Sequence, residues 1–110
     1  MGTPQQSEAL YTEGAGRVLG NLANARAVLG DTQCAIAHYE KSLDIAKQVA
    51  NETLEASACL NLALLLVQEK QPHAARAYAE TATRLFRAIG YAEYVERAEQ
   101  VLRKLGGPSR

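Results

Sequence analysis

Residues 61–72 read NLALLLVQEKQP, and residues 21–32 read NLANARAVLGDT. Both stretches begin Asn-Leu-Ala, so they align when the chain is shifted against itself by 40 residues. The same shift pairs identical residues further along the chain: Ala35 with Ala75, Ala37 with Ala77 and Glu40 with Glu80. Self-similarity at a fixed period indicates a repeated supersecondary unit, which buries its apolar face by stacking on its neighbours.

Residues that end and start helices fall at equivalent places in the two copies. Gly30-Asp31 separates two helical patterns in the first copy, and Gln71-Pro72 separates two in the second. Glycine can end a helix in the left-handed conformation, whereas aspartate caps a helix start and proline suits its first turn. Asn51 and Gly90 are further stop signals. The sequence therefore predicts five main helices, at residues 13–29, 32–50, 53–69, 72–89 and 92–105, and a short helical turn at residues 7–11.

The apolar residues of these segments indicate how the helices stack. The middle segment, 53–69, is apolar on nearly every side, which is typical of a helix covered by neighbours on both sides. Small residues, which let paired helices approach closely, recur at Ala23, Ala35, Ala63, Ala75 and Ala82. The last segment is apolar on one face only, and its other face offers the pairs Glu93–Arg97 and Glu99–Arg103 at helical i,i+4 spacing. It is typical of a solenoid's terminal cap.

Composition narrows the function classes. The chain has 110 residues, enough for one domain, and 12 basic residues balance 12 acidic ones, so no net charge favours nucleic acid or an anionic membrane. No apolar run is long enough to span a bilayer, and the first residues lack a secretory pattern. Cys34 and Cys59 are interpreted as small buried hydrophobes in a reducing compartment, which predicts a cytoplasmic protein.

No catalytic, cofactor or metal site is predicted. Gly14-Ala15-Gly16 resembles part of a phosphate loop, but no strand precedes it and no Lys-Ser/Thr follows. His38 and His73 lie in different copies of the repeat, and neither is interpreted as a catalytic or metal-binding residue. Glu40 and Asp44 share a helix face, where neighbouring lysines indicate a solvated surface rather than an acid/base pair.

The repeated pattern resembles the tetratricopeptide (TPR) repeat in its longer form. The matching positions are Leu22, Ala23, Gly30, Asp31, Ala35 and Tyr39 in the first copy and Leu62, Ala63, Ala75 and Ala82 in the second. The resemblance implies an all-α fold, a right-handed solenoid of helical hairpins with two repeats and a C-terminal capping helix. It divides the chain into a leader at residues 1–12 that is partly disordered or a short helix, a TPR-like domain at 13–105, and a flexible tail at 106–110.

In TPR proteins the first helix of each repeat lines a concave groove that holds peptides or partner helices. The positions that the resemblance assigns to the groove are Arg17, Gly20, Asn24, Ala27, Ser57, Leu60, Leu64, Val67, Arg97 and Gln100, with Lys104 as a further candidate. The family's carboxylate clamp, which grips an acidic C-terminal tail, is matched at Asn24, Asn61 and Arg97. Gly20 and Val101 stand at two other clamp positions that need basic residues.

The sequence therefore predicts a non-catalytic protein-interaction module that binds a peptide or helix in this groove. The preferred ligand has apolar anchors and some acidic character, because Leu60, Leu64 and Val67 form a stripe bordered by Arg17 and Arg97. Two alternatives stay open. The chain self-associates as a homodimer through its exposed first helix, or it is a fragment of a larger TPR-containing regulatory protein.

Overall fold

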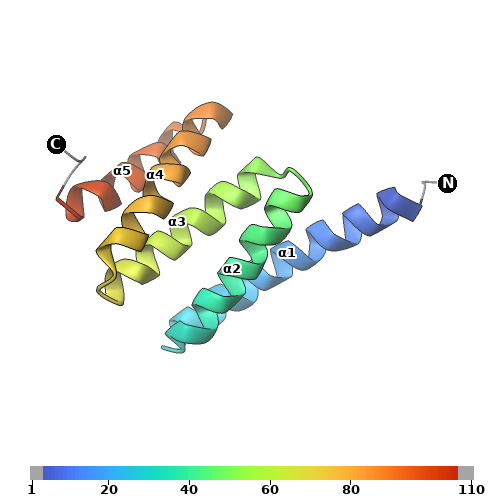
Figure 1. The fold of residues 1–110 in the computed structure, drawn as a ribbon, viewed down its shortest axis with the longest axis horizontal. Coiled ribbons are helices and arrows are strands. Elements are labelled where there is room, and N and C mark those ends of the chain that lie inside the picture. The colour runs from blue at the N-terminus through green and yellow to red at the C-terminus, as the bar shows by residue number, and fades with distance from the viewer. Residues whose placement is uncertain (1–3, 107–110) are drawn as a thin grey trace.

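The computed structural model describes the backbone of residues 4–106 and the side chains of residues 14–106. Five helices follow one another in this part of the chain: α1 (Pro4–Val28), α2 (Thr32–Gln48), α3 (Glu52–Gln68), α4 (Pro72–Ile89) and α5 (Ala92–Lys104) (Figure 1). No strand occurs within residues 4–106, so the predicted all-α class is confirmed. Four of the five predicted helices agree with these bounds closely.

The first helix is longer than predicted. It runs without a break from Pro4, whereas the sequence predicted a start at residue 13 after a separate turn. Proline suits the first turn of a helix, and no residue between it and Gly14 forces a break. Gly16 sits where a Cβ would lie 2.9 Å from Cγ2 of Ile45 and 3.0 Å from Cδ2 of Leu54, so its lack of a side chain gives α1 room to pack. Residues 1–3 of the predicted leader and 107–110 of the predicted tail lie outside the described residues.

The helices form a stack of hairpins. α1 packs on α2 and α3 packs on α4, while α2 also contacts α3 and α4 contacts α5 (Figure 1). Contacts of α3 with both α1 and α5 place these three helices along one side of the stack. The small residues predicted to allow close packing are fully buried: Ala23, Ala35, Ala63, Ala75 and Ala82. Equivalent helices start 40 residues apart, at Thr32 and Pro72 and at Glu52 and Ala92.

Helix ends follow the predicted chemistry with two exceptions. Gly30 and Gly90 take left-handed φ angles of 84° and 92°, and Pro72 opens α4. Asn51, predicted as a stop, instead caps α3, because its side-chain oxygen accepts a hydrogen bond of 3.0 Å from the Leu54 amide. Asp31 precedes α2 without capping it, and its carboxylate lies 3.6 Å from the Arg26 guanidinium.

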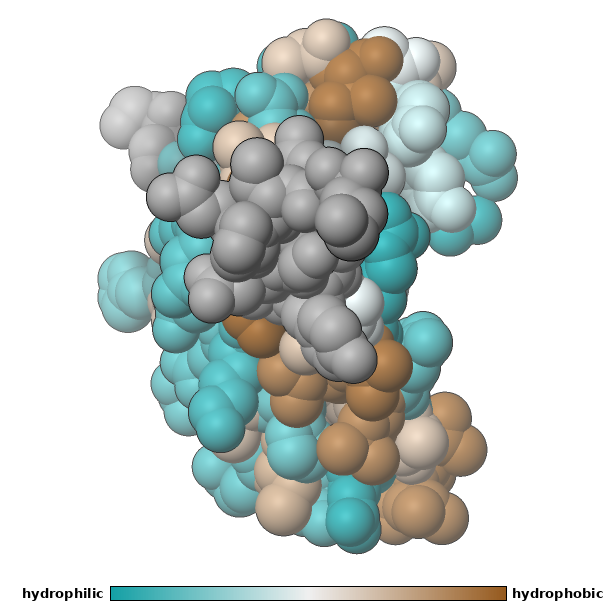
Figure 2. Space-filling model, turned by 90° about the vertical axis from the view of Figure 1, so that its right-hand side faces the viewer, coloured by the Kyte–Doolittle hydropathy of each residue, from teal (hydrophilic) through white to brown (hydrophobic). Residues whose placement is uncertain are grey.

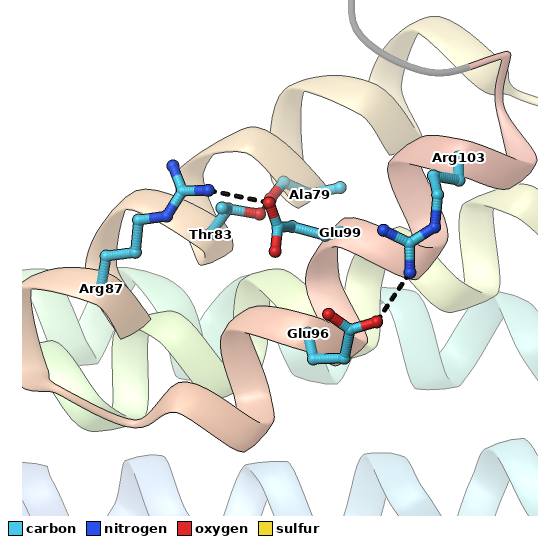
Figure 3. A network of polar contacts seen from close by, with 6 residues as sticks. All are labelled: Ala79, Thr83, Arg87, Glu96, Glu99 and Arg103. Carbon is cyan, nitrogen blue, oxygen red and sulfur yellow. Dashed lines mark hydrogen bonds and ion pairs between the residues drawn. The ribbon is translucent and has the colours of Figure 1, made fainter.

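Charged side chains on the outer side of α5 pair differently from the sequence prediction. Arg97 contacts Glu93 at 3.2 Å as expected. The predicted pair Glu99–Arg103 is wrong, because Glu99 binds Arg87 of α4 at 2.8 Å and Arg103 binds Glu96 at 2.8 Å (Figure 3). Helical spacing predicts which side chains of one helix can meet, but a side chain of a neighbouring helix can be a competing partner. The pairs are exposed, so each adds little to stability.

The two cysteines occupy different environments. Cys59 is buried in the core, but Cys34 is exposed, which corrects the prediction that both are buried. Cys34 lies beside the buried stripe of α2, which runs through Ala35, Tyr39 and Leu43. Burial raises the pKa of the Cys59 thiol from 9.0 to about 11, and a hydrogen bond to the Asp31 carboxylate raises the pKa of the Cys34 thiol.

We expect alkylation to separate these thiols. Iodoacetamide at pH 8 should label Cys34 at least about tenfold faster than Cys59, because only the thiolate reacts and Cys59 is both buried and protonated. The unfolded chain loses the Cys59 proton near pH 9 and the folded chain near pH 11, so the free energy of unfolding should fall as pH rises through this window. Timed labelling read by mass spectrometry checks the rates, and equal rates at the two sites would contradict the packing of α3.

Candidate binding groove

A groove runs along the side of the stack formed by α1, α3 and α5. Its main part is a cavity of about 560 Å³, and a smaller cavity of about 280 Å³ adjoins it. Asn24, Ser57 and Asn61 line both cavities, so the two form one continuous depression. The larger cavity is also lined by Leu60, Leu64, Phe86, Tyr94, Arg97, Gln100, Val101 and Lys104, and the smaller by Arg17, Gly20, Asn21, Tyr39, Ser42, Leu54 and Ala58.

Most of the residues that the sequence assigned to a groove lie along this depression. Those that line one or both cavities are Arg17, Gly20, Asn24, Ser57, Leu60, Leu64, Arg97 and Gln100. Ala27 and Val67 line neither cavity. They occupy equivalent positions on α1 and α3, where both are partly buried against the hydrophobic core instead.

The apolar stripe predicted on α3 is narrower than expected. Leu60 lines the larger cavity but is only 6% exposed and belongs to the core, whereas Leu64 is 43% exposed. Val67 lies outside the cavities. Leu64 is therefore the apolar side chain of the predicted stripe that a ligand could reach most easily.

The groove carries positive charge. Arg97 and Lys104 line the larger cavity and Arg17 lines the smaller one, while no described residue that lines either cavity is acidic. Arg97 also pairs with Glu93 at 3.2 Å, so an acidic side chain lies beside the groove although none lines it. The guanidinium of Arg97 is held 4.9 Å from the centroid of the Tyr94 ring, a cation–π contact that orients it.

A comparison of the sequence with models of known protein families agrees with this stack of paired helices. A sequence model described as tetratricopeptide repeat matches residues 14–88, from α1 into the last turn of α4. The chain belongs to the tetratricopeptide repeat family. The searches of curated proteins and of solved structures found no significant match.

The TPR carboxylate clamp can now be compared with the groove. Asn24, Asn61 and Arg97, which match it, all line the larger cavity. Gly20 offers no side chain, and Val101 is a buried apolar residue, so two of the clamp's cationic positions have no charge. Besides Arg97, the positive groups that line this TPR groove are Arg17 and Lys104, which stand at other positions.

Side chains of α2 support the groove from behind. The Tyr39 hydroxyl donates a hydrogen bond to Oδ1 of Asn24, and the buried Ser42 hydroxyl donates one of 2.8 Å to the Gly16 carbonyl. Burial raises the pKa of Tyr39, which keeps its hydroxyl protonated as a donor. With Oδ1 of Asn24 held by Tyr39, its amide NH₂ group is left as the donor for a ligand.

Sequence reasoning missed several lining residues. Leu54 and Tyr94 are equivalent under the 40-residue shift, and each lines one of the cavities. Extending the groove register to the first turns of α3 and α5 would have found both. Tyr39 and Phe86 belong to the second helices of the hairpins, so a pattern based on first helices could not reach them.

Among the residues that the structure describes, no group of three or more His, Cys, Asp and Glu side chains could hold a metal ion. No helix in the described part of the chain is long and apolar enough to cross a membrane.

Proposed function

We propose that this chain is a non-catalytic protein-interaction module whose groove binds a peptide or helix bearing an apolar side chain and acidic groups. TPR proteins in general bind other proteins, and the groove supplies the finer proposal. The observation that carries it is the exposed Leu64 in a cavity edged by Arg97 and Lys104, with no acidic residue among its described lining.

The apolar and the charged residues of the groove are expected to contribute differently to binding. A cavity of about 560 Å³ is within the usual range for sites that bind small molecules or side chains. An apolar anchor against Leu64 and the neighbouring Tyr94 ring would supply most of the affinity. Carboxylates of the ligand would meet Arg97 and Lys104 at the rim, where exposed charges mainly set the orientation and the association rate.

We expect Leu64→Glu to weaken binding at least about 30-fold, because an anchor residue contributes roughly 2 kcal/mol or more at a hot spot. The full chain would first select binders from a random peptide library displayed on phage, and titration calorimetry would then compare the selected peptides on each variant. The circular dichroism spectrum should not change, since Leu64 is exposed.

Two further variants control this experiment. Leu64→Ala removes the anchor without adding charge, so it should also weaken binding, which separates packing from repulsion of an acidic peptide. Ala77→Glu adds the same charge to an exposed site on α4 outside both cavities and should leave affinity unchanged. Selected peptides that bind Leu64→Glu as tightly as the original chain, or that lack acidic residues, would contradict the proposal.

Assembly through the first helix is the second candidate function. It would take the form of a homodimeric scaffold or of a place within a larger TPR-containing regulatory protein. The observation that favours it is a set of exposed apolar side chains on α1 and just after its end: Val18, Leu22, Val28 and Leu29. Exposed apolar clusters of this kind often mark an interface.

A further inference from the structure

The two hairpins place different pairs of side chains at equivalent positions beside the groove. In the first hairpin, Tyr39 of α2 is buried, and its hydroxyl donates a hydrogen bond to Oδ1 of Asn24 on α1. Under the 40-residue shift, the equivalent pair is Ala79 on α4 and Leu64 on α3. Leu64 is exposed in the larger cavity, and Ala79 is fully buried with no polar atom in its side chain. The same two repeat positions are therefore polar in one half of the groove and apolar in the other.

This difference does not reflect a first hairpin that is more polar throughout. Figure 2 shows apolar surface gathered in the lower part of the view, over the α1–α2 hairpin. Val28, the last residue of α1, and Leu29, which follows it, are 87% and 77% exposed. The polar pair belongs to the groove, because Asn24 lines both cavities and Tyr39 lines the smaller one.

The contact with Tyr39 fixes which atoms Asn24 offers to a ligand. Asn24 is exposed, and an unrestrained asparagine amide can rotate to present either its carbonyl oxygen or its NH₂ group. Rotation here would take the acceptor away from the hydroxyl of Tyr39, a buried donor that is costly to leave without a partner. The orientation that keeps the hydrogen bond presents the NH₂ group, which can only donate.

Arg17 adds a positive charge to the same part of the groove. Among the described residues that line the smaller cavity, it is the only charged one. A guanidinium binds a carboxylate through two parallel hydrogen bonds, so Arg17 and Asn24 together match one singly charged acceptor group. The TPR clamp for a terminal carboxylate lacks charge at Gly20 and Val101, which makes a side-chain carboxylate the better match.

We infer that Tyr39 sets the specificity of this half of the groove: by holding Asn24, it makes the smaller cavity a subsite for a side-chain carboxylate of the bound peptide and not for the isosteric carboxamide. The inference rests on the proposed function, because it concerns the peptide that binds the same groove. It adds a second subsite, with the apolar anchor at Leu64 in the larger cavity and this carboxylate beside Asn24. Tyr39 is a positioning residue, since it acts through Asn24.

Peptides selected on the full chain from the displayed library test this inference. They are joined to the phage coat protein at their C-terminus, so a free terminal carboxylate plays no part in their selection, and they are synthesised with an amidated C-terminus. Each acidic residue of a peptide is then replaced in turn by its carboxamide isostere. Titration calorimetry gives the ratio of the two dissociation constants, called the carboxylate preference of that peptide position below.

We expect one acidic position to show a carboxylate preference of at least about tenfold on the original chain, because hydrogen bonds to a charged group are strong. Tyr39→Phe should lower this preference to about threefold or less, since Asn24 can then rotate and accept a hydrogen bond from the carboxamide. Arg17→Gln should lower the preference at the same position. Acidic positions that meet Arg97 or Lys104 should keep their preference in both variants.

Two further variants control the measurement. Tyr78→Phe removes the same hydroxyl group from a residue of α4 that lines neither cavity, so it should change no carboxylate preference. Asn24→Asp keeps an acceptor for the Tyr39 hydroxyl but replaces the NH₂ group with oxygen, so it should reverse the preference in favour of the carboxamide. Circular dichroism and urea unfolding check that each variant folds. A loss of stability alone weakens both peptides of a pair equally and leaves their ratio unchanged.

Three results would overturn the inference while the proposed function stands, provided that binding still depends on Leu64. The first is that no acidic position has a tenfold preference on the original chain. The second is a preference that Tyr39→Phe leaves unchanged, or that Tyr78→Phe lowers as much. The third is tighter binding of the carboxylate peptide than of its isostere by Asn24→Asp. Peptide binding that is independent of Leu64 would instead contradict the proposed function, and the inference with it.

Discussion

Replacing Phe86 with alanine is expected to lower the free energy of unfolding by about 3–5 kcal/mol, the usual loss when a buried aromatic side chain is truncated. Phe86 is 1% exposed and joins α4 to α5. Its ring centroid lies 5.0 Å from that of Tyr94 and 6.4 Å from that of Tyr91. Because a domain of this size has a net stability of only about 5–15 kcal/mol, this one change should remove a large part of it.

The effect should concentrate at the C-terminal end of the groove. α5 holds Arg97, Gln100 and Lys104, which line the larger cavity, and few contacts other than those with α4 secure it. Urea denaturation followed by circular dichroism gives the loss in stability, and hydrogen exchange should show faster exchange in α5 than in α1. Leu64→Ala removes a comparable apolar side chain from an exposed site, so it serves as the control and should change stability little. Equal losses for the two variants would contradict the described packing of α4 on α5.

The fold was predictable because each helix carries its own start, stop and apolar period. Pro72 and Gly90 mark the ends of α4. The apolar residues on nearly every side of α3 predicted that this helix is buried between its neighbours. The predictions that failed concerned side chains with two possible partners, between which the sequence does not distinguish. Glu99 could reach Arg103 on its own helix or Arg87 on the next one, and Asp31 could cap α2 or bind Arg26.

The sequence predicted which side of α3 faces the groove, but not how exposed each side chain on that side is. The repeat register places Leu60, Leu64 and Val67 on one side of α3, yet only Leu64 among them is exposed. How deep each one lies depends on the neighbouring helices, and a register within one helix carries no such information. The hydrogen bond from Tyr39 to Asn24 crosses from α2 to α1, so a pattern confined to first helices could not reveal it.

Leu62→Ala is the second change with a large expected effect, and Leu22→Ala is its matched control. The two leucines occupy the same position in the two repeats, on α3 and on α1. Leu62 is fully buried, so its truncation should cost about 2–5 kcal/mol through lost burial and the cavity left behind. Leu22 is 39% exposed at the open end of the stack, so the same truncation should cost roughly 1 kcal/mol or less.

The residue type, the position in the repeat and the substitution are the same in both variants. A difference in the free energy of unfolding therefore reports only how well neighbouring residues cover each leucine. Urea unfolding at two protein concentrations provides the measurement. A cost at Leu22 that equals the cost at Leu62 would show that the exposed apolar side chains of α1 are covered in solution, and dependence of that cost on concentration would assign the cover to a second copy. A small, concentration-independent cost would show that Leu22 is open to solvent in the 110-residue chain and would contradict self-association through α1.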